Sequence, residues 1–204
     1  ETHAEVGDRA SEPLRVNGKE VKARIIGEGG NLGTTQRGRI EYAMNGGRIN
    51  TDFIDNVGGV DCSDNEVNIK ILLNALVASG DMTLKQRNDL LYSMTNDVAD
   101  IVISDCYRQT QSISVSMLLG AEQLKEYTRF IHALEKDGKL NRELEFLPTD
   151  EALAERMVKG QGLTRPEMSI LTAYGKMVLK EQLVTPEVSE APYFKQLLLG
   201  AFPS

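Results

Sequence analysis

The sequence predicts an α/β segment over residues 1–61, followed by a predominantly α-helical part over residues 62–204. Most of the 18 glycines lie in the first sixty residues, where short alternating stretches run into glycine-rich turns. After residue 62, glycine is sparse and apolar residues recur at helical spacing. The order strand, loop, helix, strand and loop in the first part is typical of α/β folds.

Two short stretches alternate apolar and polar side chains as half-buried strands do: Val21–Ile26 and Arg48–Ile54. Each is expected to end in a sharp turn, the first at Gly27 and the second over Asn56–Gly59. Between them, Thr34-Thr35 supplies hydroxyl caps for a helix that is expected to end near Asn45, before two glycines.

Hydroxyl residues that precede Glu, Gln or Pro mark the helix starts in the second part. Capping boxes or N-terminal patterns begin at Ser63, Thr83, Thr149, Thr164 and Thr185. The spacing of apolar residues along each helix predicts which face is buried.

The helix that starts at Ser63 is expected to end at Gly80 and to bury a face that includes Val67, Ile71 and Leu72. The next helix is expected to run past Val102 with Leu84 and Leu90 inward. Residues 111–136 predict one or two further helices that stop at Gly138.

Charge and hydropathy exclude several classes of protein. Lys and Arg total 23 against 30 Asp and Glu, a net charge of −7, which excludes a general nucleic-acid binder and disfavours anionic membranes. No apolar run is long enough to span a membrane, and the first twenty residues lack the apolar core of a secretory signal. Because the chain begins with Glu rather than Met, we expect a piece of a longer protein.

Few residues offer metal or nucleophile chemistry. Cys62 and Cys106 are far apart and only His3 and His132 could assist them, so we expect no metal and a reduced, cytoplasmic setting. His132 lies among apolar residues and is expected to be structural, and no phosphate-binding P-loop is present. Cys62 is open to two interpretations, an activated thiol at a helix N-terminus or an inert buried one.

Two glycine-rich loops that follow the expected strands form the candidate site: residues 27–35 and 55–63. If the strands pair, the loops lie side by side, where α/β proteins bind ligands. Small residues let a ligand approach backbone N–H groups, and a helix N-terminus attracts a carboxylate. Taken alone, the first loop is also consistent with a simple turn, because Leu32 stands where the dinucleotide-binding pattern has a glycine. Ser63 is also consistent with a plain helix cap.

Together the two loops carry a resemblance to the glutamate dehydrogenases. GEGGNLGTTQRGRIEYA and GGRINTDFIDNVGGVDCSDNEVN are similar to the end of the Rossmann-like dinucleotide domain of that family, most closely in the large bacterial NAD-specific enzymes. YRQTQSISV and LTRPEMSILTAYGK resemble the helical C-terminal region of those enzymes. The resemblance implies a C-terminal fragment, with the end of the NAD-binding domain over residues 1–61 and a helical C-terminal domain over residues 62–204.

Carried over position by position, the resemblance implies these cofactor-binding residues for NAD: Glu28, Gly29, Asn31, Asn56 and Gly58. Ser63 would meet the side-chain carboxylate of L-glutamate. The family reaction, part of amino-acid catabolism, is oxidative deamination of glutamate to 2-oxoglutarate and ammonia with hydride transfer to NAD.

Other parts of that machinery have no counterpart in this sequence. The catalytic Lys and Asp of the family belong to an upstream domain, and an intact GxGxxG is absent, so we assign no catalytic residue and expect the isolated chain to be inactive. The resemblance also implies a homo-oligomer for the full-length enzyme.

A non-catalytic module is the alternative class of function. Residues 61–204 are rich in capped amphipathic helices and carry no convincing catalytic set, as expected of an oligomerisation or regulatory domain.

Overall fold

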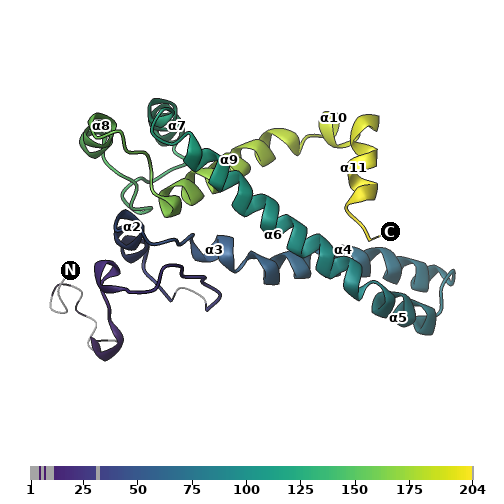
Figure 1. The fold of residues 1–204 in the computed structure, drawn as a ribbon. Coiled ribbons are helices and arrows are strands. Elements are labelled where there is room, and N and C mark those ends of the chain that lie inside the picture. Colours follow the sequence, from purple (N-terminus) through teal and green to yellow (C-terminus); the bar gives the residue numbers. More distant parts are fainter. Residues whose placement is uncertain (1–4, 6, 8–11, 31–32, 204) are drawn as a thin grey trace. The chain divides into compact units, whose positions relative to one another are not determined.

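The computed structural model describes residues 5, 7, 12–30 and 33–203. Within these residues the chain is predominantly helical, and no β-strand is formed. The chain folds as two compact units, each made of two stretches of sequence: residues 1–55 with 112–175, and residues 56–111 with 176–204. Figure 1 shows the helices in chain order, from purple at the N-terminus to yellow at the C-terminus.

The first unit starts with loops that pack on one short helix. α2 (Gln36–Met44) begins after Thr35, whose hydroxyl accepts a hydrogen bond from the Gly38 N–H, and ends at Asn45, as the sequence predicted. Two 3-10 turns precede it, η1 (Glu12–Leu14) and η2 (Gly18–Glu20). Gly18 lies so close to α2 that an added Cβ would come within 2.6 Å of backbone atoms there.

The prediction of two strands in this segment is wrong. Ile25 and Arg48 form an isolated parallel bridge, with hydrogen bonds from the Ile26 N–H to the Arg48 carbonyl and from the Arg48 N–H to the Arg24 carbonyl. The second stretch then winds into α3 (Asp52–Asp55). A parallel sheet is stabilised by further strands and by cover on both faces. The described residues provide only the Ile25–Arg48 pair, and Ile25 is 67% exposed. The hydrogen-bond ladder between the two segments therefore does not extend into a sheet.

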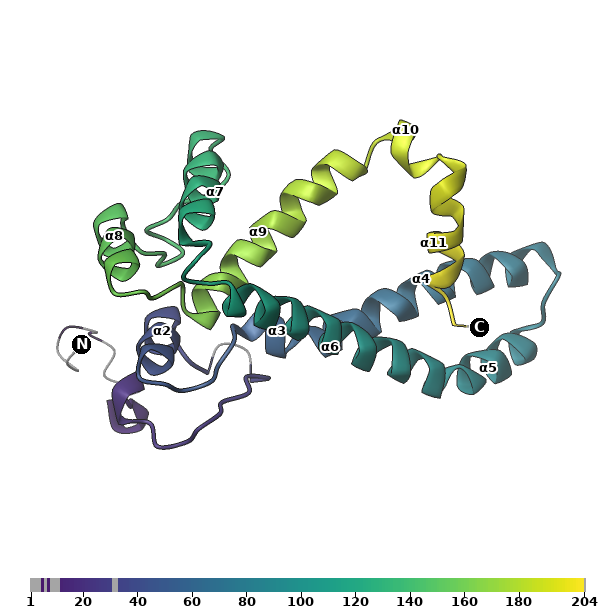
Figure 2. The same cartoon turned by 45° about the horizontal axis from the view of Figure 1, so that its top comes forward.

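The rest of the first unit is a group of helices around an apolar core. α7 (Leu124–Lys136) packs against α8 (Asp150–Val158), and Figures 1 and 2 both place them side by side. α8 starts after Thr149 and α9 (Arg165–Leu183) directly after Thr164, which confirms both predicted starts. The buried apolar side chains of this core include Leu124, Ile131, Leu134, Leu153, Leu163, Ile170 and Leu171.

The second unit contains α4 (Val57–Ser79), α5 (Leu84–Ser93) and the part of α6 (Thr95–Leu118) up to residue 111. α4 ends at Gly80, whose φ of +83° suits glycine, and Thr83 forms the predicted capping box with Gln86. The C-terminal stretch adds the rest of α9, α10 (Pro186–Ser189), η3 (Pro192–Phe194) and α11 (Lys195–Gly200). Thr185 caps α10 as predicted.

Two helix boundaries in α4 and α6 differ from the prediction. α4 begins at Val57, so Asn56–Gly59 is not a turn and Ser63 lies inside the helix instead of capping it. Glycines weaken a helix by only about 1 kcal/mol each, so Gly58 and Gly59 do not prevent this 23-residue helix from starting at Val57. A break at Met94 separates α5 from α6, and α6 then continues without interruption to Leu118.

The faces expected to be buried on α4 and α5 are largely exposed. Val67, Ile71 and Leu72 are 53%, 66% and 50% exposed, whereas Ile69 and Leu73 are buried. α5 has no buried residue among those described. Helical spacing was predicted correctly, but the buried face depends on which neighbouring elements are present. Among the described residues, no helix is both long enough and apolar enough to cross a bilayer.

Candidate functional site

Glu28 in the first glycine-rich loop is turned inward. Its side chain is 4% exposed and accepts hydrogen bonds from the Arg39 Nε at 2.5 Å and from the Thr34 N–H at 2.8 Å. Arg39, from α2, is equally buried at 5%. This ion pair holds the loop against α2, so the carboxylate of Glu28 organises the loop rather than facing solvent.

The glycines of this loop expose their backbone. Gly27, Gly29 and Gly30 are exposed, and a Cβ built on any of them would meet nothing within 4 Å. Asn31, the amide side chain expected to face the cofactor, lies outside the described residues. The loop therefore presents accessible N–H and C=O groups, the donors and acceptors that ribose hydroxyls and a carboxamide require.

The second loop places its predicted residues around the start of α4. Asn56 is the N-cap residue, with φ −90° and ψ 2°, and Gly58 follows in the first turn. A Cβ on Gly58 would lie 3.8 Å from the Cys106 sulfur, an ordinary contact, so crowding does not require glycine there. Ser63 is exposed inside the helix, which corrects its expected place at the helix N-terminus.

The two loops meet at Asp55. The Glu28 N–H donates to Asp55 Oδ2 at 3.1 Å, and the Asn50 side-chain amide donates to Asp55 Oδ1 at 2.6 Å. Asp55 is the residue directly before Asn56 in the chain. The first loop is thus attached to the end of the second stretch, beside the parallel bridge of Ile25 and Arg48.

These residues suit a dinucleotide in part. Exposed glycine backbone and the first N–H groups of a long helix are suitable donors for ribose, amide or carboxylate oxygens. The Glu28 carboxylate is 4% exposed and each of its oxygens already accepts a hydrogen bond from the protein, so it is not presented to a ribose in this arrangement. The fit therefore lies with backbone groups and the Asn56 end of α4.

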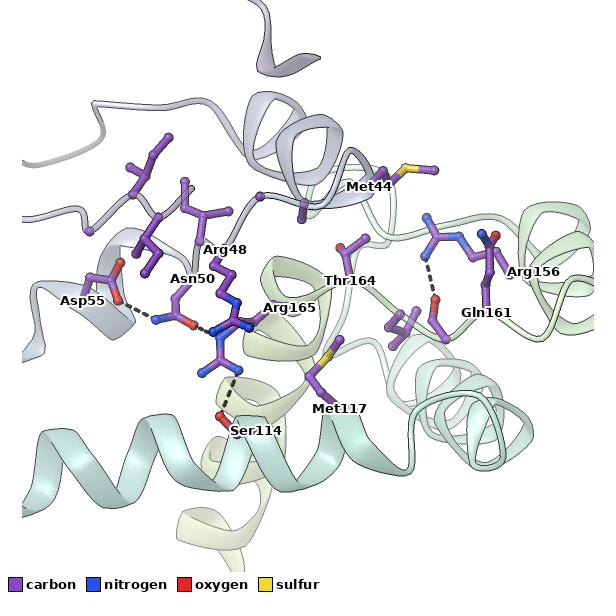
Figure 3. A pocket seen from close by; sticks show the side chains of 18 residues that line it. Met44, Arg48, Asn50, Asp55, Ser114, Met117, Arg156, Gln161, Thr164 and Arg165 are labelled. Carbon is purple, nitrogen blue, oxygen red and sulfur yellow. Dashed lines mark hydrogen bonds between the residues drawn. The ribbon is translucent and has the colours of Figure 1, made fainter. Parts of the chain in front are cut away.

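A cavity of about 760 Å³ lies within the first unit, next to the bridge (Figure 3). Its volume falls in the range of small-molecule sites. The polar side chains that line it belong to Arg48, Asn50, Asp55, Ser114, Arg156, Gln161, Thr164 and Arg165. Gly27 also lines it, so the cavity borders the first loop without including Glu28 or Gly29.

Arg165 donates hydrogen bonds to two neutral side chains in this cavity. Its Nε donates to Asn50 Oδ1 at 2.5 Å and its terminal nitrogen to the Ser114 hydroxyl at 3.0 Å. Figure 3 shows this chain of hydrogen bonds from Asp55 through Asn50 and Arg165 to Ser114. Burial lowers the pKa of Arg165, Asp55 opposes the shift, and Arg48 adds to it.

Sequence reasoning missed Arg165 and Asn50 as site residues. The Thr164-Arg165-Pro166-Glu167 pattern indicated a helix start, which is correct, but the arginine itself carried a second signal. A cation at the first position of a helix is disfavoured by the helix dipole, so an arginine there needs another explanation. The contact between Arg165 and Asn50 spans 115 positions and is visible only in the fold.

A smaller cavity of about 330 Å³ in the second unit is acidic. Asp61, Asp64 and Asp105 line it together with Cys106 and Lys176. Burial raises the pKa of Asp61, and the carboxylates of Asp105 and Asp64 raise it further. In the described part of the chain, His, Cys, Asp and Glu form no group that could hold a metal ion.

The thiols and His132 show no nucleophilic arrangement. Cys62 lies in the second turn of α4 rather than at its N-terminus, and it is exposed. Burial, with the nearby carboxylates of Asp61 and Asp105, raises the pKa of Cys106, which disfavours the reactive thiolate. His132 Nε2 lies 2.9 Å from the Asp150 carboxylate and joins α7 to α8, a structural contact.

Two family models match the sequence. The model described as "Bacterial NAD-glutamate dehydrogenase, catalytic domain" matches residues 1–116, more than half of the chain. A second, described as "Glutamate dehydrogenase, C-terminal", matches residues 160–204. The first match includes both glycine-rich loops and the second includes Arg165.

Curated relatives match along the whole chain. The NAD-specific glutamate dehydrogenases of Pseudomonas aeruginosa, Halomonas elongata and Mycobacterium tuberculosis are 54%, 53% and 45% identical over all 204 residues. The chain spans 13% of the length of each of these relatives.

Proposed function

Because the chain belongs to the family of bacterial NAD-glutamate dehydrogenases, we propose that it acts as part of an NAD-dependent oxidoreductase that deaminates L-glutamate to 2-oxoglutarate and ammonia. When bound, NAD supplies the hydride acceptor. The catalytic Lys and Asp of this chemistry are expected elsewhere in the enzyme, so this chain contributes binding and positioning and is inactive when isolated.

The observation that carries the proposal is the attachment of one glycine-rich loop to the end of the other. The hydrogen bond from the Glu28 N–H to Asp55 ties the exposed glycine backbone to the residue before Asn56. Ligand sites in α/β enzymes use two such neighbouring loops. Both loops lie within the 116 residues that match the catalytic-domain model.

The proposed roles follow from the chemistry of each group. Backbone groups at Gly29 and Gly58, and the amides of Asn31 and Asn56, bind the nicotinamide end of NAD. Glu28 supports this role indirectly, by fixing the loop through Arg39. Ser63 takes the side-chain carboxylate of glutamate, with its hydroxyl exposed on α4.

The parallel bridge supports a Rossmann-like origin for residues 1–61, with residues 62–204 as a helical C-terminal domain. In such domains, two parallel strands are joined by a crossover that contains a helix. The segments of Ile25 and Arg48 pair in parallel and are joined through α2, which is the same pattern. Adjacent strands from the preceding part of the longer enzyme would extend the Ile25–Arg48 pair into a sheet. Two free thiols suit a reducing, cytoplasmic compartment.

The test is Asn56→Ala in the longer enzyme, with Asn68→Ala as the matched control on an exposed position of the same helix. Loss of one polar group that positions the reacting centre should lower kcat about a hundredfold. Steady-state kinetics with glutamate and NAD give the result, and Asn68→Ala should behave as wild type. Wild-type turnover in Asn56→Ala would contradict the site assignment.

An oligomerisation role for the helical part is a second candidate, favoured by the exposed apolar residues of α4. Val67, Ile71 and Leu72 lie on one face and are at least half exposed. Such a face is typical of a surface that another subunit covers. Ile71→Glu in this exposed face should change the assembly of the longer enzyme, measured by light scattering, while isolated subunits keep their chemistry.

A further inference from the structure

The cavity of the first unit contains positive charge that its own residues only partly neutralise. Arg48 and Arg165 both line it, and Figure 3 shows their guanidinium groups in the same part of the cavity. The one carboxylate among the lining side chains is Asp55. Arg156 also lines the cavity, but it forms a two-pronged ion pair with Glu167, at 2.7 and 2.9 Å.

The guanidinium group of Arg165 is oriented before any ligand binds. Arg165 donates to the neutral side chains of Asn50 and Ser114, which hold its guanidinium group in the cavity. Asp55 is itself engaged by Asn50 and by the Glu28 N–H. A guanidinium held by its neighbours loses little conformational freedom on binding, which favours affinity.

The start of α9 adds to the positive potential. Thr164 and Arg165 line the cavity where this 19-residue helix begins, and a helix N-terminus carries about half a unit of positive charge. An arginine in this position repels that dipole, and the pKa of Arg165 is lowered by burial and by Arg48. An anion between Arg165, Arg48 and the helix N-terminus would relieve both the repulsion between the two arginines and the repulsion from the helix dipole.

The charge balance indicates the kind of anion. Two arginines and one aspartate leave one net positive charge in a chain of net charge −7, and the helix N-terminus brings the total to about one and a half. A carboxylate carries one negative charge, whereas a phosphate monoester carries about 1.5 to 2 at neutral pH. Guanidinium groups bind phosphate oxygens in pairs of hydrogen bonds.

We propose that this cavity binds the phosphate group of a small molecule, with Arg165 and Arg48 as its ligands. The volume of about 760 Å³ leaves room for a body attached to the phosphate. The cavity borders the glycine loops at Gly27 and Asp55, but it includes none of the residues expected to bind NAD.

The experiment is calorimetric titration of the 204-residue chain with inorganic phosphate and with glycerol 3-phosphate, at constant ionic strength set by chloride. We expect saturable binding that Arg165→Gln and Arg48→Gln each weaken about tenfold or more, because each removes a charged hydrogen-bond donor. Arg129→Gln is the matched control, since Arg129 is an exposed arginine on α7 in the same unit. It should leave the affinity unchanged.

Arg48→Gln keeps the test decisive if Arg165→Gln unfolds, because the Arg48 side chain is exposed. Tighter binding of glycerol 3-phosphate than of phosphate would support a small-molecule ester. No saturable binding, equal loss in Arg129→Gln, or binding of succinate but not phosphate would overturn the proposal. Displacement of phosphate by NAD would overturn it too, by assigning the cavity to the cofactor.

Discussion

Glu28 shows how one residue can belong to a binding loop and to the core. Its carboxylate is buried against Arg39, and both of its oxygens accept hydrogen bonds inside the protein. An ion pair of this kind is costly to break from one side, because the remaining charge is left buried without its partner.

Replacement of Glu28 with Gln should therefore lower the free energy of unfolding by about 3 kcal/mol, measured by urea titration. Glu66→Gln is the control. It removes the exposed partner of Lys70 on α4, and exposed pairs contribute little, so its effect should be within experimental error. A loss at Glu28 no larger than that at Glu66 would refute the buried-pair interpretation.

Tyr174 makes the stability of the fold depend on alkaline pH. Burial, together with its 2.7 Å hydrogen bond to Glu145, raises the pKa of Tyr174 from 10 to about 12. Because the folded pKa is above the unfolded one, this phenol contributes to stability fully below pH 10. The contribution is lost as pH rises from 10 towards 12.

Ultraviolet absorbance should show a tyrosine component that titrates near pH 12 and that disappears in Tyr174→Phe. Tyr92→Phe, at a side chain that is 85% exposed, should leave that late component in place. A late component that persists in Tyr174→Phe would assign the raised pKa to another residue.

At the scale of elements, two glycines have different roles: one allows close packing, and the other only lowers helix propensity. Gly18 lets η2 approach α2 until only a hydrogen fits, whereas Gly59 lies in α4 with nothing within 4 Å of its Cβ position. The same substitution should thus have opposite effects at the two sites.

Gly18→Ala should lower the free energy of unfolding by about 1–3 kcal/mol, because backbone atoms must move apart. Gly59→Ala should raise it by about 0.5–1 kcal/mol, through better helix propensity and a less flexible unfolded chain. Thermal unfolding of both variants measures the difference. Equal effects of one sign would contradict the packing described for η2 and α2.

At the scale of the whole molecule, the backbone hydrogen bonding of residues 21–30 differs from that of the long helices. Residues 21–30 form few backbone hydrogen bonds, of which the Ile26 and Glu28 N–H groups make two with distant residues. Residues 62–79 lie within one continuous helix. Opening free energies follow this local density of protected hydrogen bonds.

Amide hydrogen exchange followed by NMR should therefore be faster over residues 1–60 than over residues 62–105, with Ile26 and Glu28 slower than their neighbours. Uniform protection would show that the first segment is as stable as α4, contrary to this expectation. Fast exchange at Ile26 would show that the parallel bridge does not persist in solution.

The local signals of the sequence were sufficient for most helix ends. The Thr35, Thr83, Thr149, Thr164 and Thr185 starts and the Gly80 and Gly138 stops depend on short-range hydrogen bonds and on φ, which a few neighbouring residues determine. The family resemblance also needed only the order of residues. The bound roles of Glu28, Gly29, Asn31, Asn56, Gly58 and Ser63 remain predictions.

By itself, then, the sequence determined the threonine caps, the helical character of the later residues and the family, because these depend on neighbours along the chain. The tertiary structure decided that the two expected strands meet only at Ile25 and Arg48, because a sheet needs partners from outside the segment. It also decided which face of α4 is buried and that Arg165 meets Asn50. Those outcomes depend on contacts between residues far apart in sequence, which no local pattern records.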